Sequence, residues 1–133
     1  MAVISSKSLA EKLGVKEGFR AILINAPENY DTLLNPSKKK IIWGKKLSGM
    51  FDFIQCFTEE EKSLTTQFPQ LKKYLKPDGM LWVSWPKITT DSNTDFNEDL
   101  IRKTGLKFGL IDTIVCAVDD KWSGLKFMYR LQR

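Results

Sequence analysis

Residues 18–30 read Gly-Phe-Arg-Ala-Ile-Leu-Ile-Asn-Ala-Pro-Glu-Asn-Tyr, an apolar run followed by residues that favour the start of a helix. The centre of the run, Ala21–Ile24, is apolar on both faces, which is typical of a strand in a sheet covered by helices on both sides. Pro27 suits the first turn of a helix, because its missing N–H would have no partner there. The loop between strand and helix has none of the glycines that nucleotide-binding proteins usually place at this point. The stretch therefore predicts a strand, a loop of unusual chemistry and a helix.

The rest of the chain alternates between predicted helices and strands. Ser8–Glu11 is a capping-box pattern and Gly14 follows at C-cap spacing, so a short helix is expected there. Thr58–Glu61 is a second capping box, which is expected to open a helix that runs to about residue 75. A further helix is expected to begin at Asp95 with Glu98 and to end at Gly105. The expected strands cover residues 19–25, 51–57, 80–85, 108–118 and 124–131, with a turn at 77–79. The basic segment 35–49 is ambiguous, and residues 40–43 are a candidate for a short edge strand whose formation the sequence leaves open.

This order of elements predicts an α/β fold, a three-layer, Rossmann-like and mostly parallel sheet with helices on both faces and right-handed crossovers. The last two strands are joined by Asp119–Ser123, a spacing that suggests an antiparallel hairpin, so the C-terminal strand alone is expected to run antiparallel. No repeat, low-complexity segment or linker interrupts the chain. Its 133 residues are therefore expected to form one domain, residues 1–133.

The composition excludes several classes of protein. With 42% hydrophobic residues the chain is expected to fold, and no apolar run approaches the roughly 20 residues that span a bilayer. The apolar stretch after Met1 is too short for a signal peptide, which favours a cytoplasmic protein without a membrane partner. The absence of histidine and the two scattered cysteines argue against a metal site and a histidine-based catalytic centre. Cys56 lies inside an apolar run and is interpreted as an inert core thiol.

The net charge of +5 and the isoelectric point near 9.2 raise the question of nucleic-acid binding. Five lysines lie in the segment Lys38–Lys46, and three more lie at the end of a predicted helix. No RNA- or DNA-binding motif accompanies them, so a solubilising surface is the preferred interpretation. Nucleic-acid binding through Lys38–Lys46 is kept as a weaker alternative.

Residues 74–83, Tyr-Leu-Lys-Pro-Asp-Gly-Met-Leu-Trp-Val, form a turn and a strand after a strand and a helix, and a hairpin closes the chain. This layout resembles the second half of the S-adenosylmethionine (SAM)-dependent methyltransferase fold. Four segments are also similar to a family of small uncharacterised bacterial proteins, a domain of unknown function. They are residues 23–27 (Leu-Ile-Asn-Ala-Pro), 81–87 (Leu-Trp-Val-Ser-Trp-Pro-Lys), 112–119 (ending in Cys-Ala-Val-Asp) and 122–127 (Trp-Ser-Gly-Leu-Lys-Phe). The resemblance implies a truncated methyltransferase-like Rossmann domain, and it supplies no activity.

The opening stretch departs from the methyltransferase pattern in two ways. In that fold the loop after the first strand is glycine-rich because the cofactor lies against bare backbone, whereas Asn25–Glu28 presents side chains. The acidic residue that normally holds the ribose after the second strand has no clear counterpart, since the segment Lys40–Lys46 is basic. No cofactor is therefore predicted, and SAM is disfavoured.

Loops that leave the carboxyl ends of parallel strands share one edge of the sheet, and ligands bind there near the reversal of strand order. Segments 25–28, 58–59, 85–87 and 119–123 are expected to meet at this edge. Aromatic walls with a few polar groups are typical of a small-molecule pocket, and the acidic residues favour a neutral or cationic ligand over a phosphate. The candidate ligand-binding residues are Asn25, Glu28, Trp85, Lys87, Asp119, Asp120, Trp122 and Ser123.

Each candidate also has a structural interpretation. The two tryptophans can cap the core, Lys87 can form an ion pair with Asp119 or Asp120, and Thr58 can cap a helix. The main functional hypothesis is a non-catalytic domain, without catalytic residues, that binds an unidentified small molecule or protein. The alternative is a divergent SAM-dependent methyltransferase.

Overall fold

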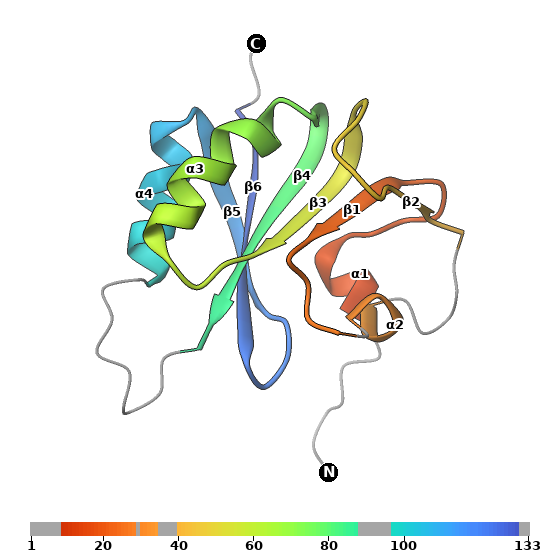
Figure 1. Cartoon of the computed structure of the whole chain (residues 1–133), viewed down its shortest axis with the longest axis horizontal. Helices are drawn as coiled ribbons and strands as arrows, with labels where there is room; N and C mark the ends of the chain where they lie inside the picture. Colours follow the sequence, from red (N-terminus) through yellow and green to blue (C-terminus); the bar gives the residue numbers. More distant parts are fainter. Residues whose placement is uncertain (1–8, 29, 35–39, 88–96, 131–133) are drawn as a thin grey trace.

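The computed structural model describes residues 9–28, 30–34, 40–87 and 97–130 (Figure 1). None of the helices in these ranges is long and apolar enough to cross a membrane. The elements follow the predicted order of helices and strands. In chain order they are α1 (Leu9–Leu13), β1 (Arg20–Ile24), α2 (Tyr30–Leu34), β2 (Ile42–Trp43), β3 (Phe51–Phe57), α3 (Glu61–Lys72), β4 (Leu75–Pro86), α4 (Glu98–Lys107), β5 (Leu110–Ala117) and β6 (Trp122–Tyr129).

The strands form one six-stranded sheet in the order β2-β1-β3-β4-β6-β5. β1 pairs in parallel with β2 and β3, and β3 pairs in parallel with β4. β6 runs antiparallel to both of its neighbours, β4 and β5. These pairings confirm the predicted fold class, in which only the last strand runs against the others. Within the segment 40–43, which the sequence left open, Ile42–Trp43 forms the edge strand β2.

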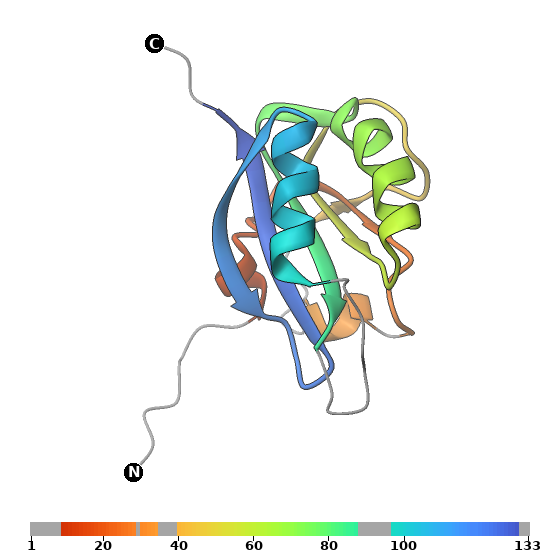
Figure 2. The ribbon, with the colours of Figure 1, turned by 90° about the vertical axis from the view of Figure 1, so that its left-hand side faces the viewer.

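Helices cover both faces of the sheet, α3 and α4 on one and α1 and α2 on the other (Figures 1 and 2). The core is divided accordingly into two clusters. Phe68 of α3 and Ile101 of α4 belong to the first cluster, and Leu13 of α1 and Tyr30 of α2 belong to the second. Trp82 of β4 is fully buried in the second cluster, and its indole N–H donates a hydrogen bond of 2.9 Å to the carbonyl of Leu13.

Residues 44–50 carry the chain from β2 to β3, across β1, without a helix. The N–H of Gly44 donates to the carbonyl of Ala21 at 2.7 Å, so the crossover begins while still paired with β1. A Cβ on Gly44 would lie 2.6 Å from the ring of Phe51, which explains why a glycine stands there. Leu47 packs against the core on the α3 side.

The turn predicted at residues 77–79 lies inside a strand. β4 begins at Leu75 and pairs with Phe51, and the next pair is Met80 with Phe53. Four residues of β4 therefore oppose a single residue of β3, and the turn residues form an irregularity within the strand. Gly79 is required there because a Cβ would lie 2.9 Å from the carbonyl oxygen of Phe51.

Three predicted helix boundaries are wrong. Pro27 lies before α2 and not in its first turn, because α2 begins at Tyr30. The helix after β3 begins at Glu61 and not after Thr58, because the N–H of Thr58 still bonds to the carbonyl of Ser84 on β4 at 2.9 Å. Gly105 lies buried inside α4 and does not end it, whereas Gly109, with φ 89°, follows the helix end. The predicted caps at Ser8 and Asp95 lie outside the described residues.

Candidate functional site

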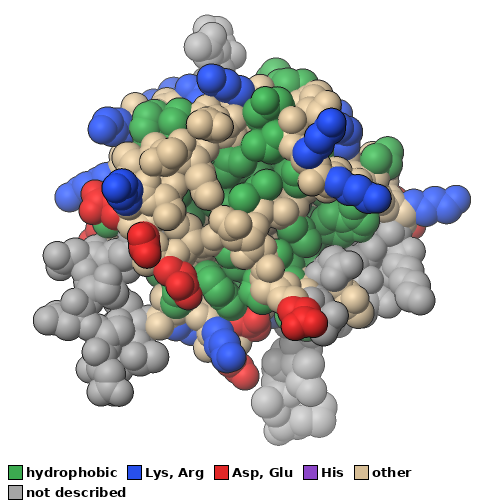
Figure 3. Space-filling view, in the orientation of Figure 1, with side chains coloured by type: hydrophobic (Ala, Val, Ile, Leu, Met, Phe, Trp, Pro, Cys, Tyr) green, Lys and Arg blue, Asp and Glu red, His purple; other side chains and the backbone are tan. Residues whose placement is uncertain are grey.

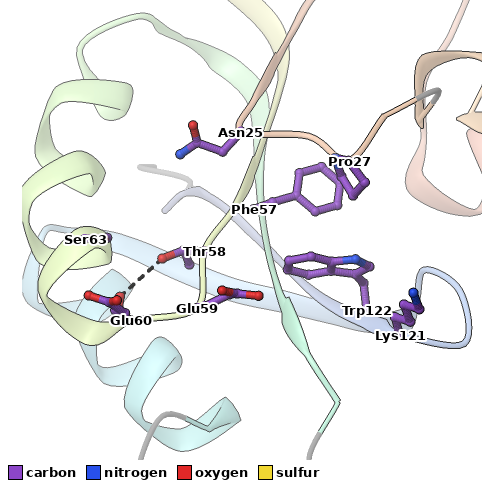
Figure 4. Close-up of a pocket in the computed structure, with 9 residues that line it drawn as sticks. All are labelled: Asn25, Pro27, Phe57, Thr58, Glu59, Glu60, Ser63, Lys121 and Trp122. Carbon is purple, nitrogen blue, oxygen red and sulfur yellow. Dashed lines mark hydrogen bonds between the residues drawn. The ribbon is translucent and has the colours of Figure 1, made fainter.

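The strand order reverses between β1 and β3, because the chain passes from β1 to β2 on one side and from β3 to β4 on the other. Ligands of open α/β sheets bind at the carboxyl ends of the strands at such a reversal. A pocket of about 610 Å³ opens at this point, and we call it the switch pocket (Figure 4). It is lined by Asn25, Pro27, Phe57, Thr58, Glu59, Glu60, Ser63, Lys121 and Trp122.

Asn25 is the first residue after β1 and has a φ of 58°, in the left-handed region. No other non-glycine residue among those described has a positive φ. Asparagine enters this region more readily than most residues, because its short polar side chain can bond locally. The loop after β1 therefore makes the sharp turn for which related folds use glycine, and it makes it without a glycine.

The aromatic wall of the switch pocket consists of Phe57, the last residue of β3, and Trp122, the first residue of β6. Their rings meet edge to face with centroids 5.0 Å apart. Phe57 also meets Tyr30 of α2 edge to face at 4.8 Å. In Figure 4 the ring of Phe57 lies beside Pro27 and next to the indole of Trp122. The wall thus brings α2 and β3 into contact with the C-terminal strand β6.

A buried chain of hydrogen bonds supports this wall. The hydroxyl of Tyr30 donates to Oε1 of Gln55 at 2.9 Å, and Nε2 of Gln55 donates to the hydroxyl of Ser84 at 2.9 Å. Burial raises the pKa of Tyr30 well above its usual value of 10.0, so the hydroxyl stays protonated as the donor. The chain ties α2 to β3 and β4 and fixes the position of the ring that packs on Phe57.

The hairpin tip that carries Trp122 is held by Asp119. One carboxylate oxygen of Asp119, Oδ1, accepts the N–H groups of Lys121 and Trp122, both at 2.8 Å. This is the local pattern by which aspartate stabilises a turn. The candidate Asp119 therefore stabilises the hairpin turn that carries Trp122, and its own side chain does not line the switch pocket or the two pockets next to it.

Charged side chains of both signs lie around the switch pocket. Glu59 and Glu60 are exposed just before α3, where the positive end of the helix favours carboxylates. Lys121 approaches from the hairpin. Figure 3 shows that most Asp and Glu side chains of this face lie in its lower half, towards the carboxyl ends of the parallel strands, and that most Lys and Arg side chains lie in the upper half.

The structure brings some of the predicted residues together. Asn25 and Trp122 both line the switch pocket. Lys87 and Asp120 join Trp122 in a neighbouring pocket of about 270 Å³, which we call the hairpin pocket and which is also lined by Glu59, Pro86 and Lys121. The backbone N–H of Lys87 bonds to the carbonyl of Lys121 at 2.8 Å, which holds the two loops side by side.

Other predicted residues lie elsewhere. Trp85 is 5% exposed and belongs to the core under α3 and α4, on the opposite face of the sheet from Trp122. Trp85 and Ser123 line a third pocket of about 570 Å³ with Lys87, Asn97, Glu98 and Asp99. Glu28 is exposed and lines none of these three pockets. The eight candidates therefore do not form one pocket.

The ion pair expected between Lys87 and Asp119 or Asp120 is not among the ion pairs of the described residues. The described charged groups also contain no cluster that could hold a metal ion. Cys56 is fully buried, and burial raises its pKa to about 12, which makes the thiol unreactive near neutral pH. Of the basic segment, Lys40, Lys45 and Lys46 are exposed, and Lys38 and Lys39 lie outside the described residues.

Three residues of the switch pocket, Phe57, Glu60 and Ser63, lie outside the four segments that were expected at this edge. A signal for Phe57 was present, because residues 53, 55 and 57 of a strand share one face and the last of them must reach the carboxyl edge. Glu60 and Ser63 follow from the later start of α3, and no sequence pattern indicated that start.

No family model matches the sequence, and no curated protein matches it. Solved structures of methyltransferases match the fold. A methyltransferase from Pyrococcus furiosus aligns with a TM-score of 0.60 at 14% identity, covering 92% of this chain and 81% of that chain. Magnesium protoporphyrin IX methyltransferase from Synechocystis with bound SAH aligns with 0.62 at 10% identity, covering 92% and 80%. Fibrillarin from Aeropyrum pernix with natively bound S-adenosyl-L-methionine aligns with 0.55 at 15% identity, covering 90% and 73%.

At these identities the likeness shows the fold: the chain has the Rossmann-like fold of SAM-dependent methyltransferases. The matches correct two expectations from the sequence. The hypothesis of a non-catalytic domain is wrong, since the neighbours in structure are methyltransferases. The prediction of no cofactor is also wrong, since neighbours of this fold hold SAM or SAH. Both expectations rested on the missing glycines after β1 and on the missing acidic residue after β2, and Asn25 shows that the loop after β1 can enter the left-handed region without a glycine.

Proposed function

We propose that this protein is a divergent SAM-dependent methyltransferase. The observation that carries the proposal is the switch pocket, which opens at the reversal of strand order between β1 and β3 in a methyltransferase fold. Its volume of about 610 Å³ lies within the range of roughly 300–1,000 Å³ that is usual for small-molecule and cofactor sites.

The residues of the switch pocket suit the charges of SAM. The cofactor has a positive sulfonium and ammonium group, a carboxylate and a flat adenine ring. Glu59 and Glu60 suit the positive groups, Lys121 suits the carboxylate, and Phe57 and Trp122 offer aromatic surfaces for the ring or the sulfonium. When bound, SAM supplies an electrophilic methyl group to an acceptor.

The proposed site differs from the usual pattern in the source of its carboxylates. After β2 the chain continues as Gly44-Lys45-Lys46, and Gly44 is paired with β1, so no acidic residue is available there. In this chain the carboxylates come from the loop between β3 and α3. The protein residues thus bind and orient the cofactor from the β3 side of the reversal.

We also propose that the chain belongs to the small bacterial family that it resembles and that it acts in the cytoplasm. The segment at residues 81–87 that resembles the small bacterial family runs along β4 to the carboxyl edge, and we place the chain in that family as a single domain of 133 residues. A cytoplasmic location fits an enzyme that uses SAM, and a small molecule is the proposed partner.

Calorimetric and thermal-shift titrations with SAM and SAH test this function. A ligand at about 100 times its dissociation constant adds roughly 2.7 kcal/mol to the free energy of unfolding. Stabilisation by both compounds is expected. The absence of any shift at millimolar concentrations of either compound contradicts the proposal.

A charge variant then tests the assignment of the carboxylates. The double variant Glu59→Gln/Glu60→Gln is expected to bind SAM between about two- and tenfold more weakly, since each exposed charge pair contributes about 0–1 kcal/mol. SAH lacks the sulfonium charge, so its binding is expected to fall less. Glu61→Gln is the matched control, because Glu61 is exposed on the first turn of α3 and lines neither the switch pocket nor the hairpin pocket.

A further inference from the structure

The switch pocket and the hairpin pocket share three residues, Glu59, Lys121 and Trp122. The two pockets are therefore neighbours with a common boundary. Asn25, Pro27, Phe57, Thr58, Glu60 and Ser63 line the switch pocket alone. Pro86, Lys87 and Asp120 line the hairpin pocket and not the switch pocket.

We infer that the hairpin pocket is the acceptor site and that it takes a small, neutral, planar molecule that donates a hydrogen bond to the carboxylate of Glu59. This inference rests on the proposed function, because it assigns the second substrate of the same reaction. Three properties of the pocket carry it: its size, its walls and its balance of charge.

The size and walls of the hairpin pocket select a small flat molecule. Its volume is about 270 Å³, just below the range of roughly 300–1,000 Å³ of most ligand sites, so a bicyclic ring suits it better than a peptide or a large cofactor. The half-buried indole of Trp122 and the half-buried ring of Pro86 give it apolar surface. Flat rings pack well against both types of surface.

The balance of charge selects a neutral molecule. Lys87 and Lys121 supply two positive charges, and Glu59 and Asp120 supply two negative charges. All four side chains are exposed, so an anion or a cation would gain from one pair and lose to the other. A neutral acceptor avoids this conflict and still buries its ring against Trp122.

Glu59 has the position from which it can orient the acceptor. It is the only carboxylate among the described residues that lines both pockets. A carboxylate accepts hydrogen bonds but does not donate them, so it selects an acceptor with an O–H or N–H group. The O–H or N–H group of the methyl acceptor is then held at the boundary with the switch pocket, where it donates a hydrogen bond to a carboxylate oxygen of Glu59.

The first experiment measures the binding of SAH and of 2-naphthol, a neutral bicyclic probe with one hydroxyl, by calorimetry. Asp120→Trp fills the hairpin pocket and is expected to weaken 2-naphthol binding at least tenfold while SAH affinity stays within twofold. Ser63→Trp fills the switch pocket and is expected to have the reverse effect. Both positions are on or near the surface, and circular dichroism confirms that each variant is folded.

The second experiment tests Glu59 by comparing 2-naphthol with 2-methoxynaphthalene, which has no hydrogen to donate. Wild type is expected to prefer 2-naphthol by at least about tenfold, since a hydrogen bond to a charged group contributes roughly 1.5–3 kcal/mol and every 1.4 kcal/mol is a factor of ten. Glu59→Gln is expected to reduce the preference to threefold or less. Glu60→Gln is the matched control and keeps the preference, because Glu60 lines the switch pocket alone.

The outcomes separate this inference from the proposed function. If SAH binds and 2-naphthol does not, or if Asp120→Trp leaves 2-naphthol binding intact, the acceptor site is refuted and the methyltransferase proposal stands. If 2-naphthol binds and SAH does not, the proposed function fails, and the acceptor assignment fails with it. An unchanged preference in Glu59→Gln refutes the role of this carboxylate.

Discussion

The conformation of Asn25 leads to a quantitative prediction. Its φ of 58° costs an ordinary residue roughly 1–2 kcal/mol, whereas glycine has no such cost. Glycine gives the unfolded chain extra freedom worth about 0.4–1 kcal/mol, which acts in the opposite direction. The balance predicts that Asn25→Gly is more stable than Asn25→Ala by about 0.5–1 kcal/mol. With a urea dependence of about 2 kcal/mol per molar, the two unfolding midpoints should differ by about 0.25–0.5 M.

Urea unfolding followed by circular dichroism measures this difference. Ala26→Gly is the matched control: Ala26 is half-buried and its φ is not positive, so glycine there is expected to destabilise. Asn25→Gly is also expected to retain SAM binding, since it keeps the turn. If Asn25→Ala is as stable as Asn25→Gly, the left-handed turn does not explain why an asparagine stands at this position.

Three further predictions concern the core. Gly105→Ala is expected to destabilise by about 1–3 kcal/mol, because the added Cβ would lie 2.0 Å from the ring of Phe127, and Phe127→Leu should relieve part of this cost in a double-mutant cycle. Tyr30→Phe is expected to lower the free energy of unfolding by about 1–3 kcal/mol, measured in urea, because it leaves Oε1 of Gln55 without its donor. Cys56 is expected to resist thiol reagents in the native protein at pH 8, and rapid labelling at this pH would contradict the burial of its thiol. The free energy of unfolding is expected to fall as pH rises from about 9 towards 12, because the thiol ionises at a lower pH in the unfolded chain than in the folded protein.

The sequence was sufficient for the features that depend on strand direction. A strand apolar on both faces, Ala21–Ile24, indicated a sheet between two layers of helices, and the spacing of the last two strands indicated the hairpin. From these, the carboxyl edge and the approach of Asn25 to Trp122 followed. The direction of each strand is set by the order of strands and helices along the chain, and the apolar runs in the sequence reveal this order.

Features that depend on register or on one dihedral angle were not visible in the sequence. Trp85 pairs with Ser123 across β4 and β6, so Trp85 and Trp122 point to opposite faces, and only the register of the hairpin decides this. The positive φ of Asn25 is compatible with the residue type but is not dictated by it. Thr58 matched a capping pattern, but its backbone N–H bonds to the carbonyl of Ser84 on β4, a tertiary contact that local sequence does not show.

The dependence of Trp122 on hairpin register has a consequence for how the protein can change over evolution. Surface loops generally tolerate insertions and deletions, but a one-residue change at residues 118–121 that shifts β6 along β4 would turn every β6 side chain to the other side of the sheet. The indole would then stand among the α3 and α4 side chains, and both pockets would lose their shared boundary. The tip of this loop, although it lies at the surface, is therefore expected to have a fixed length among homologues.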